Sequence, residues 1–328
     1  MRYVYALAGI KPNLPPEPEE EGMTQKPVIF IDGEAGTTGL EIRERLSSLP
    51  VTLFSIDHAR RKDPAARKDA MAAADLVVLC LPDDASREAV HMAATLGDAA
   101  PRLLDASTAF RTDSTWVYGF PELTKGQDRA IASAPRVSNP GCYPTGAIAL
   151  LRPLIDAGVL DARYPVCINA VSGYSGGGRS MIEAHERDGG PAFELYGLSL
   201  EHKHVPEIHQ HAGLGRRPVF VPSVGHFPRG MIVSIPLHLD DLSGHITGSD
   251  LHTILEEHYA GQAHVRVMPH EPKLSAEALA GSDKMELRVH AGTQTRQALL
   301  TARLDNLGKG ASGAALQNIS LMLGLNNA

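Results

Sequence analysis

The chain has 328 residues, of which 43% are hydrophobic and 21% are charged, as in ordinary globular proteins. A net charge of -7 and a pI of about 6.1 argue against electrostatic binding to nucleic acid or to an anionic membrane surface. Small-molecule partners are therefore favoured. The length favours two domains. No apolar stretch reaches the roughly 20 residues that cross a bilayer.

The first 26 residues are predicted to form a disordered tail. Residues 11–22, KPNLPPEPEEEG, combine prolines with an acidic run and offer little apolar surface to bury. A strand is predicted to begin at Val28, so Met23 is a candidate for the natural start.

Residues 27–143 show the alternation of a dinucleotide-binding domain. VIFI precedes a helix that carries Ile42, Leu46 and Leu49 on one face, and VTLFSI follows it. LVVLCL, a second helical pattern and RLLDAS continue the alternation. The pattern predicts an α/β fold with a Rossmann-type, doubly wound parallel sheet whose strand ends carry the ligand.

The glycine-rich loop after the first strand is a candidate for binding a pyrophosphate. Gly33, Gly36 and Gly39, with Thr37 and Thr38 between them, stand between a strand and a helix. Small residues there let backbone N–H groups approach a phosphate. The spacing is GxxGxxG and not GxGxxG, so a plain tight turn is the alternative.

A basic cluster follows the second strand, where enzymes that use NAD place an acid for the ribose. The residues at 57–62 read DHARRK, and a cluster containing Arg60 suits the 2′-phosphate of NADP. A solvated surface turn is the alternative. Pro82, directly after the third strand, is a further predicted cofactor contact.

Cys142 is the candidate nucleophile. It follows the turn-forming residues Asn139-Pro140-Gly141 and precedes an apolar helical pattern, which places the thiol at a helix N-terminus. Free N–H groups there favour the thiolate and can hold an oxyanion. Cys80 and Cys167 lie inside apolar runs and are predicted to be buried. The three cysteines show no CxxC spacing, so we expect a reducing compartment, the cytoplasm.

The pattern changes after about residue 165. Strand-like runs such as VCINAVSG, PVFVPSV, MIVSIPLHL and ALLTARL follow with few helices between them, which predicts a mostly antiparallel sheet. We assign residues 144–305 to an α+β domain for catalysis and oligomerisation. Residues 306–328 end in a helical pattern with Ala314 and Ile319 on one face.

The segment EHKHVPEIHQH supplies candidate proton carriers. His204 is the predicted acid/base group, with Glu207 as the carboxylate that orients its ring and His202 as a possible contributor. An alternative is a zinc hydrolase in which His202, His204, His209 and His211, in one strand or loop, bind the metal. That reading leaves the glycine loop and Cys142 without a role.

The stretches SNPGCYPTGA (138–147), NAVSGYSGGGR (169–179), HKHVPEI (202–208) and DNLGKGASGAALQN (305–318) together resemble the N-acetyl-γ-glutamyl-phosphate reductase family, in its shorter subgroup. The resemblance runs from about Pro27 to about Gly324. It implies NADPH-dependent reduction of N-acetyl-γ-glutamyl phosphate to the semialdehyde, with phosphate release, in arginine biosynthesis. A related aspartate-semialdehyde-type dehydrogenase and a dinucleotide-sensing protein without catalysis are the alternatives.

The resemblance also implies roles for individual residues. Cys142 matches the nucleophile, which forms a thioester with the substrate, and His204 matches the acid/base position, with His202 close by. The terminal helix returns to the first domain and brings Asn306 and Gly308 near the nicotinamide. A homo-oligomer, dimer or tetramer, is the family expectation, and no bound metal is expected.

Substrate groups are predicted to meet two arginines and two serines. Ser107 and Arg111, in DASTAFR, follow a strand end that faces the cleft and are candidates for the phosphate. Arg179, after the YSGGG loop, is a candidate for the substrate carboxylate, although the two arginines can exchange roles. Ser172, in the same motif, is the fourth candidate.

Overall fold

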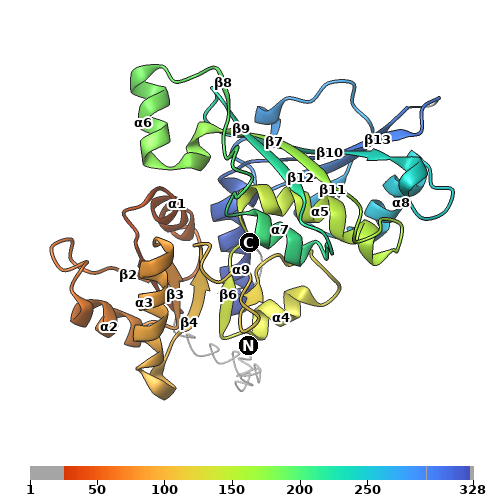
Figure 1. Cartoon of the computed structure of the whole chain (residues 1–328). Helices are drawn as coiled ribbons and strands as arrows, with labels where there is room; N and C mark the ends of the chain where they lie inside the picture. The colour runs from red at the N-terminus through yellow and green to blue at the C-terminus, as the bar shows by residue number, and fades with distance from the viewer. Residues whose placement is uncertain (1–25, 293, 326–328) are drawn as a thin grey trace, which may run out of the picture.

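The computed structural model describes residues 26–292 and 294–325, which form two α/β units (Figure 1). The predicted tail lies outside the described residues except for residue 26, and so does the candidate start at Met23. Each unit is built around one β-sheet. Helix α5, Cys142–Asp156, follows the last strand of the first sheet along the chain.

The first unit contains a six-stranded sheet. Its elements are β1 (Val28–Asp32), α1 (Thr37–Leu46), β2 (Thr52–Phe54), α2 (Pro64–Ala72), β3 (Leu76–Leu79), α3 (Asp83–Ala94), a 3-10 helix (Gly97–Ala99), β4 (Arg102–Asp105), β5 (Val117–Tyr118), α4 (Gln127–Ser133) and β6 (Arg136–Ser138). The strand order is β2-β1-β3-β4-β6-β5, and every neighbouring pair is parallel. The predicted Rossmann-type parallel sheet is confirmed.

This sheet is covered on both faces, which explains its uninterrupted apolar strands. Alternate residues of β1 enter different cores. Ile29 and Ile31 pack in the same core as Leu46, whereas Phe30 packs in the core that contains Met71. Because both faces of the sheet are covered, a ligand is expected at the edge where the carboxyl ends of the strands lie.

The C-terminal helix α9 (Gly313–Leu323) packs on the first sheet, although it follows the second sheet in the chain. Ala315, Ile319 and Met322 lie in one core with Ile29 of β1. A π-helical turn at Gly308–Ser312 precedes it. In Figure 1 this last segment descends from the second unit to the first.

The second unit contains a seven-stranded sheet. Its elements are β7 (Cys167–Gly173), a 3-10 helix (Tyr174–Gly177), α6 (Arg179–Asp188), β8 (Phe193–Leu195), α7 (Val205–His211), β9 (Val219–Gly225), β10 (Met231–His238), a 3-10 helix (Leu239–Asp241), α8 (Gly248–His258), β11 (Val265–Val267), a 3-10 helix (Ala276–Leu279), β12 (Met285–Ala291) and β13 (Gln297–Leu304). The order is β11-β12-β13-β10-β7-β9-β8. Only the β11/β12 and β7/β9 pairs are parallel, so the predicted mostly antiparallel sheet is confirmed.

The second unit has more helix than the sequence pattern predicted. Helices α6, α7 and α8 interrupt its strands, and α7 forms where the sequence suggested a strand or loop. Pro206 stands in the first turn of α7, where a proline favours helix initiation. Val205 and Ile208 are buried one turn apart. A helix this short carries too few apolar positions for its period to be recognised.

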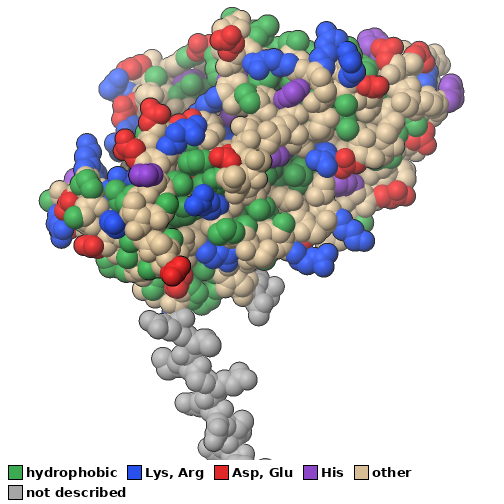
Figure 2. Space-filling model, turned by 60° about the horizontal axis from the view of Figure 1, so that its bottom comes forward, with side chains coloured by type: hydrophobic (Ala, Val, Ile, Leu, Met, Phe, Trp, Pro, Cys, Tyr) green, Lys and Arg blue, Asp and Glu red, His purple; other side chains and the backbone are tan. Residues whose placement is uncertain are grey.

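The charge on the surface is mixed. On the face shown in Figure 2, acidic and basic side chains lie interspersed with apolar ones. Among the described residues, no helix combines the length and apolar character needed to cross a membrane.

Candidate active site

Cys142 is the first residue of α5 and lines a cavity to which both units contribute. The chain enters the helix through Gly141, which is extended, and no side chain caps the first turn. The first N–H groups of α5 are therefore available to an anion. Gly310 approaches so closely that a Cβ on it would lie 3.0 Å from the Cβ of Cys142.

The thiol of Cys142 is partly exposed to this cavity, but protein surrounds it on the other sides. Burial raises its pKa to about 11, because the lowering effects of the Tyr143 N–H and of Arg111 do not offset the loss of hydration. The N–H groups at the helix N-terminus favour the thiolate, as predicted, but burial has the larger effect on the pKa. Attack by this sulfur needs a proton acceptor nearby.

His204 stands beside the turn that carries Cys142. Its Nε2 lies 2.7 Å from the position that a Cβ on Gly141 would occupy, so only glycine fits between the two segments. Burial, followed by the charges of Arg111, His202 and Lys203, holds the pKa of His204 well below its usual value. The ring is therefore neutral at pH 7. Its buried Nδ1 has no hydrogen-bond partner among the described residues.

His202 supports the backbone of this segment. Its Nδ1 accepts a hydrogen bond of 3.1 Å from the N–H of His204, and the two ring centroids are 4.8 Å apart. Burial lowers its pKa to about 4. His202 is not among the described residues that line the cavity, so His204 is the histidine that shares it with Cys142.

Glu207 does not orient His204, contrary to the prediction. One carboxylate oxygen accepts hydrogen bonds from the Tyr118 hydroxyl at 2.7 Å and from the Gly141 N–H at 2.8 Å. The other accepts a hydrogen bond from Arg111 at 3.2 Å. This carboxylate is buried and points at the start of α5, so it holds the turn before Cys142 in place.

Ser107 and Arg111 line the cavity, as the sequence suggested. The Ser107 hydroxyl donates to Asp105 at 2.7 Å. The Arg111 guanidinium also donates to the carbonyls of Asn139 at 2.9 Å and Ala106 at 3.2 Å. Arg111 is thus largely engaged in the protein, with part of its hydrogen-bonding capacity left for a ligand.

Lys203 is a site residue that the sequence analysis missed. It lines the same cavity and makes no ion pair with any described residue. Its positive charge helps to hold down the pKa of both neighbouring histidines. In the sequence, only its position between His202 and His204 could have indicated a place in the site.

A second cavity runs along the glycine loop. Gly33 and Gly36 line it. Gly33 has a φ of 90°, and it lies so close to the Cys80 carbonyl that a side chain would not fit. Gly39 packs against the loop, since a Cβ on it would lie 2.6 Å from the Gly33 carbonyl oxygen. We name this space, lined mainly by residues 30–36, 56–62 and 80–85, the dinucleotide cleft.

The predicted basic cluster reaches this cleft through different residues. Arg61 and Lys62 line it, whereas Arg60 is exposed and pairs with Asp63 at 3.0 Å. Thr37 and Thr38 line the cavity of Cys142 instead. The two spaces share Leu81 and Pro82, so Pro82 lies where a bound dinucleotide would pass from one to the other.

Asn306 also lines the cavity of Cys142. Its side-chain oxygen accepts from the Gly230 N–H and its amide donates to the Ser175 hydroxyl, both at 2.8 Å. Gly308 does not line the cavity and instead lies against the carbonyl of Ser282.

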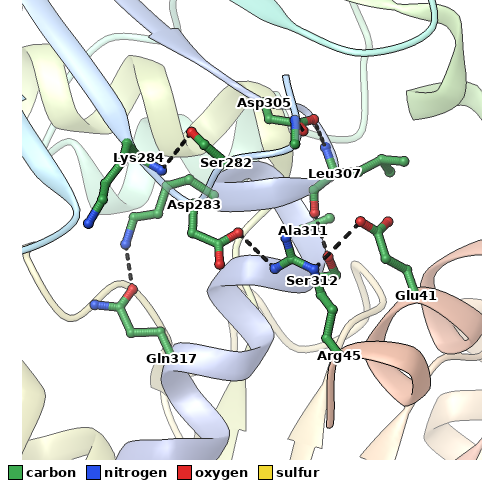
Figure 3. Close-up of polar contacts among 12 residues, drawn as sticks. Glu41, Arg45, Ser282, Asp283, Lys284, Asp305, Leu307, Ala311, Ser312 and Gln317 are labelled. Carbon is green, nitrogen blue, oxygen red and sulfur yellow. Dashed lines mark hydrogen bonds and ion pairs between the residues drawn. The ribbon is translucent and has the colours of Figure 1, made fainter. Parts of the chain in front are cut away.

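Ion pairs tie the Asn306 segment to the first unit. Figure 3 shows Arg45 of α1 between Asp283, at 2.7 Å, and Glu41, at 3.8 Å, next to the turn in which Asp305 accepts from the Leu307 N–H. Arg229 bridges Glu41 and Asp305, each at 2.9 Å. The helix that follows the glycine loop is thereby fixed relative to Asn306.

Known proteins match this chain over most of its length. The chain is 54% identical over 307 residues to N-acetyl-gamma-glutamyl-phosphate reductase 2 of Pseudomonas putida, covering 91% of this chain and 97% of that protein. It is also 54% identical over 310 residues to the N-acetyl-gamma-glutamyl-phosphate reductase of Brucella suis, covering 91% and 99%. The chain belongs to the N-acetyl-γ-glutamyl-phosphate reductase family. The predicted resemblance is confirmed.

Family models describe two parts of this chain. The model "Semialdehyde dehydrogenase, NAD binding domain" matches residues 60–131, and "Semialdehyde dehydrogenase, dimerisation domain" matches residues 142–306. The prediction of a nicotinamide-dinucleotide enzyme is confirmed.

Solved structures share the fold at low sequence identity. Aspartate semialdehyde dehydrogenase II of Vibrio cholerae superposes with a TM-score of 0.69 at 16% identity, covering 93% of this chain and 100% of that one. Aspartate semialdehyde dehydrogenase with NADP from Candida albicans has a TM-score of 0.62 at 12% identity, covering 91% and 98%. These similarities establish the fold of the chain.

Two predicted substrate residues do not line the cavity of Cys142. Ser172 is buried in β7, and its hydroxyl donates to the Gly173 carbonyl at 3.0 Å. Arg179 begins α6 and lines the dinucleotide cleft. Neither is among the described residues that line the cavity of Cys142.

The histidines that suggested a zinc site do not converge. The ring of His211 stacks on Tyr118, and its Nε2 lies 2.6 Å from the Arg111 carbonyl oxygen. His209 lies in a separate surface groove. Within the described ranges, no group of three or more histidine, cysteine or acidic side chains could hold a metal ion.

Proposed function

We propose that this chain reduces N-acetyl-γ-glutamyl phosphate with NADPH to N-acetylglutamate semialdehyde and phosphate, a step of arginine biosynthesis. The observation that carries the proposal is the meeting of Cys142 and His204 in a cavity that adjoins the dinucleotide cleft through Leu81 and Pro82. Relatives named N-acetyl-gamma-glutamyl-phosphate reductase are 54% identical over 91% of this chain.

The chemistry uses Cys142 as nucleophile and His204 as proton carrier. His204 accepts the thiol proton, the sulfur bonds to the acyl carbon, and the bond from that carbon to the phosphate oxygen breaks. N–H groups at the start of α5 stabilise the oxyanion that develops. NADPH supplies the hydride that reduces the resulting thioester. The carbon–sulfur bond then breaks to release the aldehyde, and His204 returns its proton to sulfur.

The phosphate of the substrate needs cationic and hydroxyl donors. Ser107 and Arg111 are the candidates that line the cavity, and we add Lys203, which forms no ion pair with a described carboxylate and acts on Asp83 of the same cavity only at longer range. Glu207 acts through Arg111 and Gly141 as a positioning residue.

The dinucleotide cleft fits NADP. A side chain at Gly33 would clash with the Cys80 carbonyl oxygen, so the glycine loop packs closely against the segment after β3. Gly33 and Gly36 line the cleft, where backbone N–H groups can approach a phosphate. Arg61 and Lys62 provide positive charge in the turn between β2 and α2, which favours a 2′-phosphate. We therefore assign the preference for NADP to these two residues and not to Arg60.

We infer that the protein acts as a homo-oligomer in the cytoplasm. Helices α5 and α8 pack beside β10, β12 and β13. On β10, Ile232, Ser234 and Pro236 alternate with buried residues and leave a second sheet face accessible. A second copy is the proposed occupant of that face, as a dimer or as half of a tetramer. Size-exclusion chromatography with light-scattering detection would contradict this if it gave the mass of one chain.

The decisive assay is the reverse reaction. With N-acetylglutamate semialdehyde and NADP⁺, reduction of NADP⁺ should require inorganic phosphate. Aspartate semialdehyde serves as the comparison substrate, since an aspartate-semialdehyde-type dehydrogenase would prefer it. Equal or faster turnover of aspartate semialdehyde would contradict the proposed substrate.

A further inference from the structure

Arg179 enters the dinucleotide cleft from the second unit. It is the first residue of α6, whereas the other described lining residues of the cleft lie between residues 30 and 85. Figure 1 shows α6 on the side of the second unit that lies above α1. Arg179 is thus the one described cation that the second unit contributes to the cleft.

The guanidinium of Arg179 is available to a ligand. Its side chain is 80% exposed, and its ion pair is a contact of 3.9 Å to the exposed Glu183 one turn along the helix. Such exposed pairs contribute little. By contrast, Arg67 in the same cleft is committed to the buried Asp32 at 2.6 Å.

The backbone around α6 places Arg179 at the junction of the two cavities. Gly178, with a φ of 75°, lines the cavity of Cys142, while Arg179 next to it lines the dinucleotide cleft. A molecule that extends from one space to the other would pass this point, as it would pass Leu81 and Pro82 on the opposite unit.

The far end of α6 is anchored. His185 is buried, its ring stacks on Tyr174 with centroids 4.7 Å apart, and its Nδ1 lies 2.9 Å from Nδ1 of His226. Most other residues of α6 are partly or fully exposed. The helix is thus held at one end and presents Arg179 at the other.

We propose that Arg179 binds a phosphate group of the dinucleotide, so that the second unit holds the cofactor against the glycine loop. A guanidinium can donate two parallel hydrogen bonds to such a group. The inference rests on the proposed function only in requiring a phosphorylated dinucleotide. Arg179 therefore serves the cofactor and not the substrate carboxylate or phosphate that the sequence suggested.

The test measures binding directly by titration calorimetry, without turnover. Arg179→Gln should raise the dissociation constant of NADPH about 10-fold, because a charge-assisted hydrogen bond is lost. Arg179→Lys should recover part of the affinity, since it keeps the charge but not the paired geometry. The matched control is Arg187→Gln, which removes a guanidinium of the same helix that pairs with Asp188, and it should bind NADPH as the parent does.

NADH distinguishes the two phosphate sources. If only NADPH binding weakens in Arg179→Gln, the residue contacts the 2′-phosphate, and if both weaken equally, it contacts the pyrophosphate. Unchanged affinity for both, in a variant that melts at the parent temperature, would overturn this inference while leaving the reductase proposal intact. A parent protein that binds neither dinucleotide would overturn both.

Discussion

The dinucleotide cleft and the cavity of Cys142 adjoin each other but are built differently. Three short stretches of the first unit form most of the cleft, and its cations Arg61, Lys62 and Arg179 reach an open space. The cavity of Cys142 combines segments scattered between Thr37 and Ala311, and two of its titratable groups, Arg111 and His204, are buried. Charge in the cleft is suited to binding an anion, whereas burial in the cavity sets protonation states.

This difference decides which properties each site is sensitive to. Removal of an exposed cation from the cleft changes affinity and leaves the fold intact. A change in the cavity alters a buried network, because Glu207 connects Arg111, Tyr118 and Gly141. Substitutions in the cavity should therefore lower stability and turnover together. Substitutions in the cleft should lower the affinity for the dinucleotide without lowering stability.

The largest expected effect is that of Cys142→Ser. A hydroxyl in place of the thiol is a much weaker nucleophile, so turnover should fall by at least about 1,000-fold. The dissociation constant of NADPH should stay within about twofold, because Cys142 does not line the dinucleotide cleft. Steady-state rates and calorimetry check the two halves. Appreciable residual turnover would argue against a thioester.

Glu207→Gln should have the next largest effect. The amide leaves the buried Arg111 without its counter-charge, so we expect a loss of about 3 kcal/mol in the free energy of unfolding. Turnover should drop as the turn before Cys142 loosens. Chemical denaturation measures the first effect. Glu183→Gln, which removes an exposed carboxylate, is the control and should change stability by less than about 0.5 kcal/mol.

Two glycine substitutions compare the sites directly. A Cβ at Gly141 would lie 2.6 Å from Arg111 Nη1, so Gly141→Ala should cost about 1–3 kcal/mol of stability and most of the activity. A Cβ at Gly36 meets nothing nearer than 3.4 Å, so Gly36→Ala should fold normally and weaken NADPH binding only. Thermal melts and NADPH titrations separate the outcomes. Equal destabilisation of both variants would remove the distinction between the sites.

The smallest effect concerns the reactivity of the resting thiol. Since the pKa of Cys142 is raised to about 11, the thiol predominates at neutral pH. Its alkylation rate should rise about 10-fold for each pH unit between pH 7 and pH 10, because only the thiolate reacts. Iodoacetamide labelling followed by mass spectrometry gives the rate, with Cys142→Ser as the blank. A rate that levels off below pH 8 would show that the helix N-terminus outweighs burial after all.

The sequence predicted the local parts of this protein. The glycine loop between β1 and α1, the position of Cys142 at the start of α5 and the parallel and mostly antiparallel sheets follow from patterns within one short segment. Those patterns are set by backbone preference and apolar periodicity, which act between near neighbours. The motifs that identified the family are similarly contiguous.

The tertiary structure alone decided how these parts meet. In the folded protein, Glu207 accepts hydrogen bonds from Arg111 and Gly141 and does not orient His204. Folding also places Arg179 in the dinucleotide cleft, and burial raises the pKa of Cys142. Hydrogen-bond partners, burial and through-space charge depend on which distant segments come together, and no short stretch of the chain contains that information.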